Sequence, residues 1–452
     1  MPYFKSAKNL GTILIAIMMI LLLSCARSET KKEPFEYPSR YPSETKSEDL
    51  LIETILEAEV KKELDKPPET PIGGEIERKA VMPLVIETSR ERTVGAILPL
   101  SGPYQEYGEN VLQSLILAGN FFELGNDDQS VTLLLEDSAS NTEKARHALS
   151  KLAVRSDLAA VIGPLSSQES FAAAQEAQKQ GVPLLTLTRN EAITSVGDYI
   201  FNVLPSSRTQ LNHLARYALA NSGFKRIAVL YPDVPAGRDA AEVFQDELKK
   251  EGGRVTHCVS YKDDDTDFSS EIGALLGERL DTENKDNDAR KIAHRINFDA
   301  LFIPDSAQRV AQILLQLSFY NVRGFQLLGQ SGMNAPDILM AHRELFEGAI
   351  FVDGYFPDGT MPQSSKFADR FYETYEQEAD ALDAYAYDAL KILLNLLRKH
   401  SGMTRAQLRD EMAELNGEGV RGKITTNSLR IMDSKPILVT IRDGYPVRIM
   451  TY

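Results

Sequence analysis

The feature that most constrains the fold is a regular alternation of short apolar runs with longer amphipathic segments, which begins at Thr93. The apolar runs predict strands at residues 93–98, 131–135, 159–162, 182–187, 201–204, 226–231, 255–261 and 300–303. Helical spacing of apolar residues predicts helices at residues 105–122, 143–154, 168–178, 210–221, 238–250 and 307–319. Short strands that alternate with helices are typical of parallel βαβ units, so we expect an α/β protein.

The strand and helix series starts again near residue 205, which predicts two Rossmann-like, doubly wound lobes rather than one long sheet. The run Ile227–Leu230 is continuously apolar, as expected for a strand that helices cover on both faces. Folds of this kind bind ligands at the carboxyl ends of their strands. Two such lobes therefore predict a ligand cleft between them.

The first 25 residues have the pattern of a secreted lipoprotein. Lys5 and Lys8 precede an apolar run at 13–23, which is shorter than the about 20 apolar residues of a membrane-spanning helix. The run ends in two leucines followed by Ser24 and Cys25, which resembles a bacterial lipobox. In such signals the peptide is cut before the cysteine, whose thiol then carries a lipid. We therefore expect a signal peptide at residues 1–24 and lipidation of Cys25.

The segment at residues 25–92 differs from the rest of the chain in composition. It holds seven of the 21 prolines and many charges of both signs, which is typical of a linker, with one amphipathic helix expected at 47–66. Ala26, rather than an aspartate, follows the lipobox cysteine, and this pattern implies sorting to the outer membrane in a Gram-negative host. We therefore expect a lipid-anchored tether that holds the main domain, residues 93–452, in the periplasm.

Composition argues against several functional classes. Asp and Glu number 65 against 50 Lys and Arg, and the resulting net charge of −15 argues against a nucleic-acid-binding protein. The two cysteines, Cys25 and Cys258, cannot form a disulfide framework or a four-thiolate zinc site. Cys258 lies in a strand-like alternation, so we expect its thiol to be buried and inert.

No set of residues predicts catalysis, a metal site or a cofactor. None of the six histidines has metal-ligand spacing with another ligand, and the sequence has neither a G-x-G-x-x-G loop nor a Walker A loop. Gly329–Gly332 lacks the spacing of a nucleophile elbow, and Asp263–Asp265 lacks the glycine and distal glutamate of a calcium loop. We therefore expect a protein that is not an enzyme.

Polar side chains follow three of the strands expected in the first lobe. Such hydroxyl groups can bind a small polar or anionic group where helices begin, although each can instead cap its own helix. Three such loops at one edge of a sheet favour a ligand site. The candidate ligand-binding residues on these loops are Ser101, Gly102, Ser166, Ser167, Thr186 and Thr188.

Several stretches resemble the type I periplasmic binding proteins, in the leucine/isoleucine/valine-binding branch. They are residues 94–102 with Gly108, 161–167, 181–185, 226–231 and 383–390. The resemblance covers about residues 93–452 and implies three chain crossings between the lobes. It implies a first lobe at about 93–205 and 358–418, and a second lobe at about 206–357 and 419–452.

The resemblance also implies how a ligand would be held. Amino-acid binders of this family hold the carboxylate with Ser and Thr of the first lobe and the ammonium group with an acidic residue of the second. Here Ser331 stands where that acidic residue is expected. A buried ammonium group without an anion is costly, so Asp305, which follows a strand, is a candidate to replace it. We therefore add Asp305 and Ser331 to the candidate ligand-binding residues.

A second branch of the family consists of lipoprotein activators of class A penicillin-binding proteins. Residues 185–191 and 298–305 resemble this branch more closely. Together with the lipid anchor and the tether, the resemblance implies an activator of peptidoglycan synthesis whose partner is a peptidoglycan synthase. The alternative is the solute-binding component of an ABC transporter, with an ABC permease as partner and a branched-chain amino acid or a related small molecule as ligand.

Overall fold

The computed structural model describes residues 92–121, 131–277, 296–399 and 402–450. The expected signal peptide, the lipidation site at Cys25, the tether and the helix at 47–66 lie outside the described residues. Among the residues that are described, no helix is long and apolar enough to cross a bilayer. The described strands form three sheets, here called A, B and C.

Sheet A has five parallel strands in the order β2-β1-β3-β4-β5. They are β1 (Arg92–Leu98), β2 (Val131–Asp137), β3 (Leu158–Ile162), β4 (Leu184–Thr186) and β5 (Ile200–Asn202). The connections between them hold α3 (Gln105–Gly119), α4 (Thr142–Ala153), α5 (Ser167–Gln180) and the short helix η1 (Glu191–Val196). Every residue of β3 is buried, as expected for a strand that is covered on both faces.

Sheet B has seven strands in the order β15-β14-β10-β9-β8-β6-β7, of which β14 and β15 are antiparallel to their neighbours. They are β6 (Arg226–Pro232), β7 (Arg254–Tyr261), β8 (Ala300–Phe302), β9 (Gln326–Gly329), β10 (Ile350–Asp353), β14 (Ile437–Arg442) and β15 (Tyr445–Arg448). Its helices are α6 (Ser207–Arg216), continued by the π-helical turn η2 (Tyr217–Asn221), α7 (Pro235–Lys250), α8 (Ser269–Leu276), α9 (Ala307–Phe319), η4 (Ser331–Met333), α10 (Pro336–Ala341) and α11 (Arg343–Phe346). The expected α/β class with parallel sheets is confirmed.

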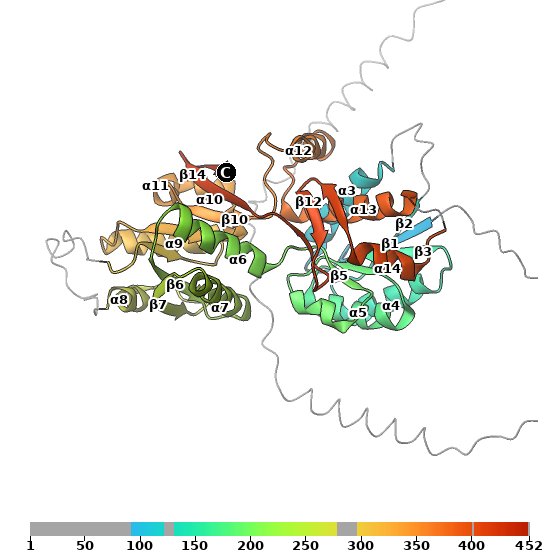
Figure 1. The fold of residues 1–452 in the computed structure, drawn as a ribbon, viewed down its shortest axis with the longest axis horizontal. Coiled ribbons are helices and arrows are strands. Elements are labelled where there is room, and N and C mark those ends of the chain that lie inside the picture. Colours follow the sequence, from blue (N-terminus) through green and yellow to red (C-terminus); the bar gives the residue numbers. More distant parts are fainter. Residues whose placement is uncertain (1–91, 122–130, 278–295, 400–401, 451–452) are drawn as a thin grey trace, which may run out of the picture. The chain divides into compact units, whose positions relative to one another are not determined.

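The chain passes between the two large sheets after β5, after β10 and before β14. After β10 it returns to sheet A through α12 (Pro362–Tyr375), α13 (Ala381–Lys399), α14 (Arg405–Ala413) and the small antiparallel sheet C. Sheet C consists of β11 (Asn416–Gly419), β12 (Gly422–Thr426) and β13 (Met432–Ser434). Figure 1 shows α3, α4, α5, α13 and α14 around the strands of sheet A, and α6 to α11 around those of sheet B.

The helix α13 completes the core over sheet A. Its residues Ala386, Leu390, Leu393 and Leu397 recur at helical spacing, are buried and belong to the same apolar cluster as Val94 of β1. At about 25 cal/mol per Å² of apolar surface, each fully buried leucine contributes about 1.5–3 kcal/mol. A segment about 290 residues after β1 is therefore needed to close this core.

The structure differs from the expected lobe boundaries at residues 419–433. Ile424 and Met432 of sheet C are buried in the core of sheet A. Arg421 is fully buried and forms an ion pair with Asp388 of α13 at 2.9 Å. The third crossing therefore follows Ser434, because these buried side chains hold the preceding segment against α13.

Cys258 was expected to be buried, and that prediction was wrong, because its side chain is exposed. It lies on β7, the last strand at one side of sheet B. An edge strand is less completely covered than a central strand, so alternation along it does not ensure burial. Burial of part of the residue still raises the pKa of the Cys258 thiol.

Candidate functional site

The strands of sheet A are parallel, so the loops that follow them meet at one edge, here called the carboxyl edge of sheet A. Ser101 lies there after β1, and its hydroxyl donates to Asp137 Oδ2 at 2.7 Å. Asp137, the last residue of β2, also accepts the N–H groups of Leu100 at 2.8 Å and Ala139 at 2.7 Å. Partial burial acts to raise the pKa of Asp137, but these hydrogen bonds outweigh it and hold the pKa below its ordinary value.

Gly102 lets the loop after β1 interlock with the loop after β2. Its φ is +87°, and a Cβ at this position would lie 2.9 Å from the carbonyl oxygen of Ala139. The hydroxyl of Ser140 donates to the carbonyl of Ser101 at 3.3 Å and accepts the N–H of Tyr104 at 3.2 Å. The two loops therefore form one hydrogen-bonded unit around Ser101.

Ser166 caps the N-terminus of α5. Its hydroxyl accepts the N–H of Glu169 at 3.3 Å and donates to Glu169 Oε2 at 2.5 Å. Glu169 is only 2% exposed, and its other oxygen, Oε1, is buried with no hydrogen-bond partner. The positive end of the α5 dipole therefore already interacts with the carboxyl group of Glu169.

The other three hydroxyls of this edge also have partners within the protein. Ser167 Oγ and Thr188 Oγ1 lie 3.1 Å apart in a hydrogen bond, and Thr188 Oγ1 accepts the N–H of Asn190 at 3.2 Å. Thr186 is fully buried and donates to the carbonyl of Phe201 at 3.0 Å. Thr186 therefore presents no atom to solvent in this structure, and a ligand-binding role for the six residues of this edge stays a prediction.

At the carboxyl edge of sheet B, Asp305 lies after β8, as expected, and both of its carboxylate oxygens accept hydrogen bonds from the protein. Its Oδ2 accepts the hydroxyl of Tyr261 at 2.5 Å, and its Oδ1 accepts the N–H of Ser306 at 2.6 Å. Burial raises the pKa of Asp305 although both hydrogen bonds act to lower it. Burial and the nearby Asp305 carboxylate raise the pKa of Tyr261 as well.

Ser331 lies in the same region as Asp305. It begins η4 and is half-buried. A Cβ on the next residue, Gly332, would lie 3.2 Å from the carbonyl oxygen of Asp305. The structure thus brings together the two candidate residues of the second lobe, although they come from loops after different strands.

The sequence did not indicate the acidic partners Asp137 and Glu169 or the tyrosine Tyr261. Glu169 stands three residues after Ser166, the spacing of a helix capping box, and this signal could have found it. Asp137 and Tyr261 each end a strand, but their hydroxyl and carboxylate partners are 36 and 44 residues away along the chain. No local pattern predicts such pairs.

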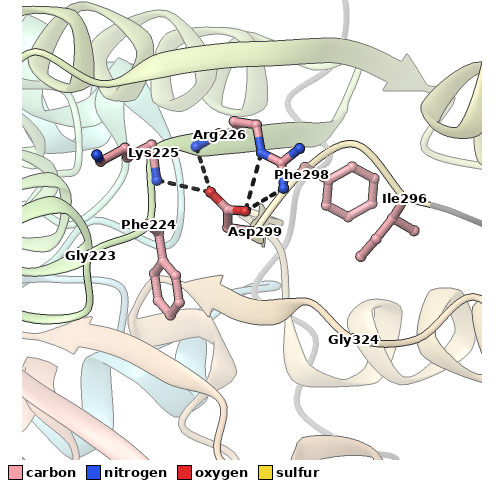
Figure 2. A pocket seen from close by; sticks show the side chains of 8 residues that line it. All are labelled: Gly223, Phe224, Lys225, Arg226, Ile296, Phe298, Asp299 and Gly324. Atoms are coloured by element: carbon pink, nitrogen blue, oxygen red, sulfur yellow. Dashed lines mark hydrogen bonds and ion pairs between the residues drawn. The ribbon is translucent and has the colours of Figure 1, made fainter.

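A hollow of about 760 Å³ lies at the opposite, amino edge of sheet B (Figure 2). Arg226 Nη2 and Asp299 Oδ1 are 2.7 Å apart there, and the N–H groups of Lys225 and Arg226 both donate to Asp299 Oδ2 at 2.9 Å. The hydrogen bond from Arg226 is the main reason that the pKa of Asp299 falls to about 2. Both oxygens of Asp299 are taken up by these bonds, and the hollow lies at the edge opposite to the predicted ligand loops, so we do not include it in the candidate site. Its lining is Gly223, Phe224, Lys225, Arg226, Ile296, Phe298, Asp299 and Gly324.

The chain is similar to known proteins of one family. A family model described as periplasmic binding protein matches residues 91–442. The chain is 25% identical over 187 residues to a Leu/Ile/Val-binding protein homolog of Brucella melitensis, a match that covers 40% of this chain and 50% of that protein. The chain thus spans about half the length of the curated relatives it matches.

Solved structures share the fold. A leucine-binding protein from Thermotoga maritima has a TM-score of 0.60 at 23% identity, over 79% of this chain and 98% of that one. A branched-chain amino acid transporter substrate-binding protein from Streptococcus pneumoniae, in complex with isoleucine, has a TM-score of 0.60 at 20% identity, over 79% of this chain and 100% of that one. At these identities the likeness concerns the fold.

Proposed function

The chain belongs to the type I periplasmic binding protein family, that of the Leu/Ile/Val-binding proteins, and on this premise we propose that it captures a small polar solute outside the cytoplasm and delivers it to an ABC permease. The observation that carries the proposal is the ordered set of polar loops at the carboxyl edge of sheet A, where Ser101, Ser166 and Thr188 lie at the ends of three parallel strands. The relatives named above, one of them solved with isoleucine, support the same role.

Thermal-shift measurements on a panel of amino acids, amines, carboxylic acids and sugars test this function. A solute present at 100 times its dissociation constant adds about 2.7 kcal/mol to the free energy of unfolding, which raises Tm measurably. We expect at least one solute of the panel to do so in a saturable way. A panel without any saturable shift would contradict solute capture.

Activation of peptidoglycan synthesis is the second candidate function. One specific observation favours it: Ser101, Ser166, Thr186 and the carboxylate of Asp305 form hydrogen bonds within the protein. The test adds the protein to a class A penicillin-binding protein and measures its rate of peptidoglycan synthesis. Stimulation by the ligand-free protein would favour this second function.

Both functions include the lipid anchor. We propose that Cys25 is acylated and that residues 25–92 tether the domain to the outer membrane, on the strength of the lipobox-like sequence alone. Replacing Cys25 with Ser is expected to release the protein from the membrane fraction and to abolish labelling with a palmitate analogue. A Cys25→Ser protein that stays lipid-labelled would show that the anchor lies elsewhere.

A further inference from the structure

The second crossing of the chain between the two large sheets, which follows β10, is buried from its first residue. Asp353, Gly354 and Tyr355 are all buried. A Cβ on Gly354 would overlap the hydroxyl oxygen of Tyr385 on α13 and would lie 3.3 Å from Cγ of Pro205 at the first crossing. Any loosening of the second crossing therefore separates buried surfaces that are in close contact.

The side chain of Asp353, the last residue of β10, is bonded to the crossing itself. Its Oδ1 accepts the N–H of Gly354 at 2.7 Å and that of Tyr355 at 3.4 Å. Its Oδ2 accepts Nδ2 of Asn334, which follows η4, at 3.0 Å. Asp353 is only 2% exposed, so water reaches its carboxyl group only when the crossing opens.

The elements that pack against β10 do not supply a cation to Asp353. Among these described elements, β9 and η4 contain no charged residue. On α6, Arg208 pairs with Glu247 at 2.6 Å and Arg216 pairs with Glu251 at 3.6 Å. The remaining titratable residue of α6, His213, is half-buried, and burial lowers its pKa, which favours its neutral form.

The fourth neighbour, β14, places Ile437 opposite Asp353, and its charged residue, Arg442, is exposed at the far end of the strand. Asp380, which precedes α13, adds a charge of the same sign as that of Asp353. Burial, and after it the charge of Asp380, raise the pKa of Asp353 to about 6, although its hydrogen bonds act to lower it. Ionisation of this carboxyl group is therefore unfavourable while the crossing stays packed.

The buried charges of α13 do not compensate Asp353 either. Tyr355 of the crossing packs in one apolar cluster with Ala384 of α13, so this helix lies beside the crossing. Asp388 of α13 is paired with Arg421 at 2.9 Å, and Asp383, which is 3% exposed, is a further buried acid. A rise in pH therefore adds negative charge here that water, rather than a cation of the protein, has to stabilise.

We propose that the second crossing is a proton-dependent joint between the two large sheets, which stays packed while Asp353 is protonated and loosens when Asp353 ionises. An acid whose pKa is raised in the folded protein contributes stability that is complete below its ordinary pKa and is lost as the pH rises through the folded pKa. For Asp353 this loss falls between its ordinary value of 3.8 and about 6. The inference concerns the domain itself and holds for either candidate function, so its failure would leave both standing.

Hydrogen exchange of the full chain at pH 5.0 and pH 7.5, corrected for the intrinsic exchange rate at each pH, tests the joint. We expect the protection of the Gly354 and Tyr355 amides to be about ten-fold lower at pH 7.5, because Asp353 regains its ordinary pKa when the crossing opens. The amides of β3, whose residues are all buried and carry no ionisable side chain, are the internal control and should keep their protection. An unchanged crossing, or an equal loss at β3, would overturn the inference.

Variants identify the titrating group. Asp353→Asn stays neutral at every pH, so its crossing should keep the same protection at both pH values, whereas Asp410→Asn, at an exposed residue of α14, should behave as wild type. Asn334→Ala removes a hydrogen bond that acts to lower the pKa of Asp353, so the midpoint of the pH profile should move upward. A ten-fold change that persists in Asp353→Asn, or an unmoved midpoint in Asn334→Ala, would show that another group controls the crossing.

Discussion

Asp137 at the carboxyl edge of sheet A and Asp305 at that of sheet B each accept a hydrogen bond from a hydroxyl group, yet their surroundings differ. Asp137 is exposed, and its hydrogen bonds lower its pKa. Asp305 is half-buried, and burial raises its pKa although its hydrogen bonds are of similar length. The comparison teaches that burial, rather than the number of donors, decides which of the two carboxyl groups carries a charge most readily.

The largest effect is expected from removing the hydroxyl of Tyr261. Tyr261→Phe takes a buried donor from Asp305 and leaves its Oδ2 without that partner. We expect the free energy of unfolding to fall by about 1–3 kcal/mol, measured by urea denaturation. Tyr445→Phe, at a side chain that is 62% exposed, is the control and should leave stability unchanged. An equal effect from both variants would show that the Tyr261–Asp305 bond contributes nothing.

The next largest effect is expected in the pH dependence of stability, which should differ between the two edges. Because the pKa of Asp305 is raised in the folded protein, its contribution to stability is complete below the ordinary aspartate pKa and is lost as the pH rises through the folded pKa. Between pH 4 and pH 7, the wild type should therefore lose more stability than the Asp305→Asn variant. Urea denaturation at a series of pH values measures this difference. An unchanged pH profile would mean that Asp305 titrates normally.

Asp137→Asn should change the pH dependence of stability in the opposite direction to Asp305→Asn. The lowered pKa of Asp137 makes its contribution complete above the ordinary pKa and lost as the pH falls. At pH 7 we expect a loss of about 0.5–1.5 kcal/mol, since Leu100 and Ala139 then donate to a neutral amide oxygen and the hydroxyl of Ser101 faces an NH2 group, to which it cannot donate. The loss should shrink in acid. A loss that grows in acid would contradict a lowered pKa at Asp137.

The smallest effect is expected from Ser101→Ala. Asp137 keeps its two backbone donors in this variant and remains accessible to water, so stability should fall by less than about 1 kcal/mol. The matched change Ser138→Ala removes a fully buried hydroxyl with no hydrogen-bond partner, and it should cost no more. A loss of several kcal/mol from Ser101→Ala would show that the exposed edge is held as tightly as the buried one.

Local sequence patterns were sufficient to predict helices whose own apolar periodicity decides which face packs against the core. The expected helix 307–319 coincides with α9, because its apolar stripe is continuous and Ser306 caps it. The expected strand 182–187 was too long, since only Leu184–Thr186 pair with neighbouring strands. Apolar residues flank β4 on both sides, and burial alone does not distinguish a strand from the chain that leads into it.

Properties that depend on strand order could not be predicted from the sequence. The exposure of Cys258 follows from the position of β7 at the edge of sheet B, and strand order is decided by pairing across the whole chain. The strand ends carrying Ser101 and Ser166 were predicted, whereas their partners Asp137 and Glu169 were not. A polar residue after a strand indicates where a site lies, but its hydrogen-bond partner decides whether it donates or accepts.

The buried pair of Asp388 and Arg421 has a consequence for the growing polypeptide. Asp388 is made 33 residues before Arg421, and both are fully enclosed in the finished protein. A chain that has emerged only as far as residue 418 would have to enclose the Asp388 carboxylate without its cation, which is unfavourable. We therefore expect sheet A to complete its core only once Arg421 has been synthesised, after the strands of sheet B up to β10.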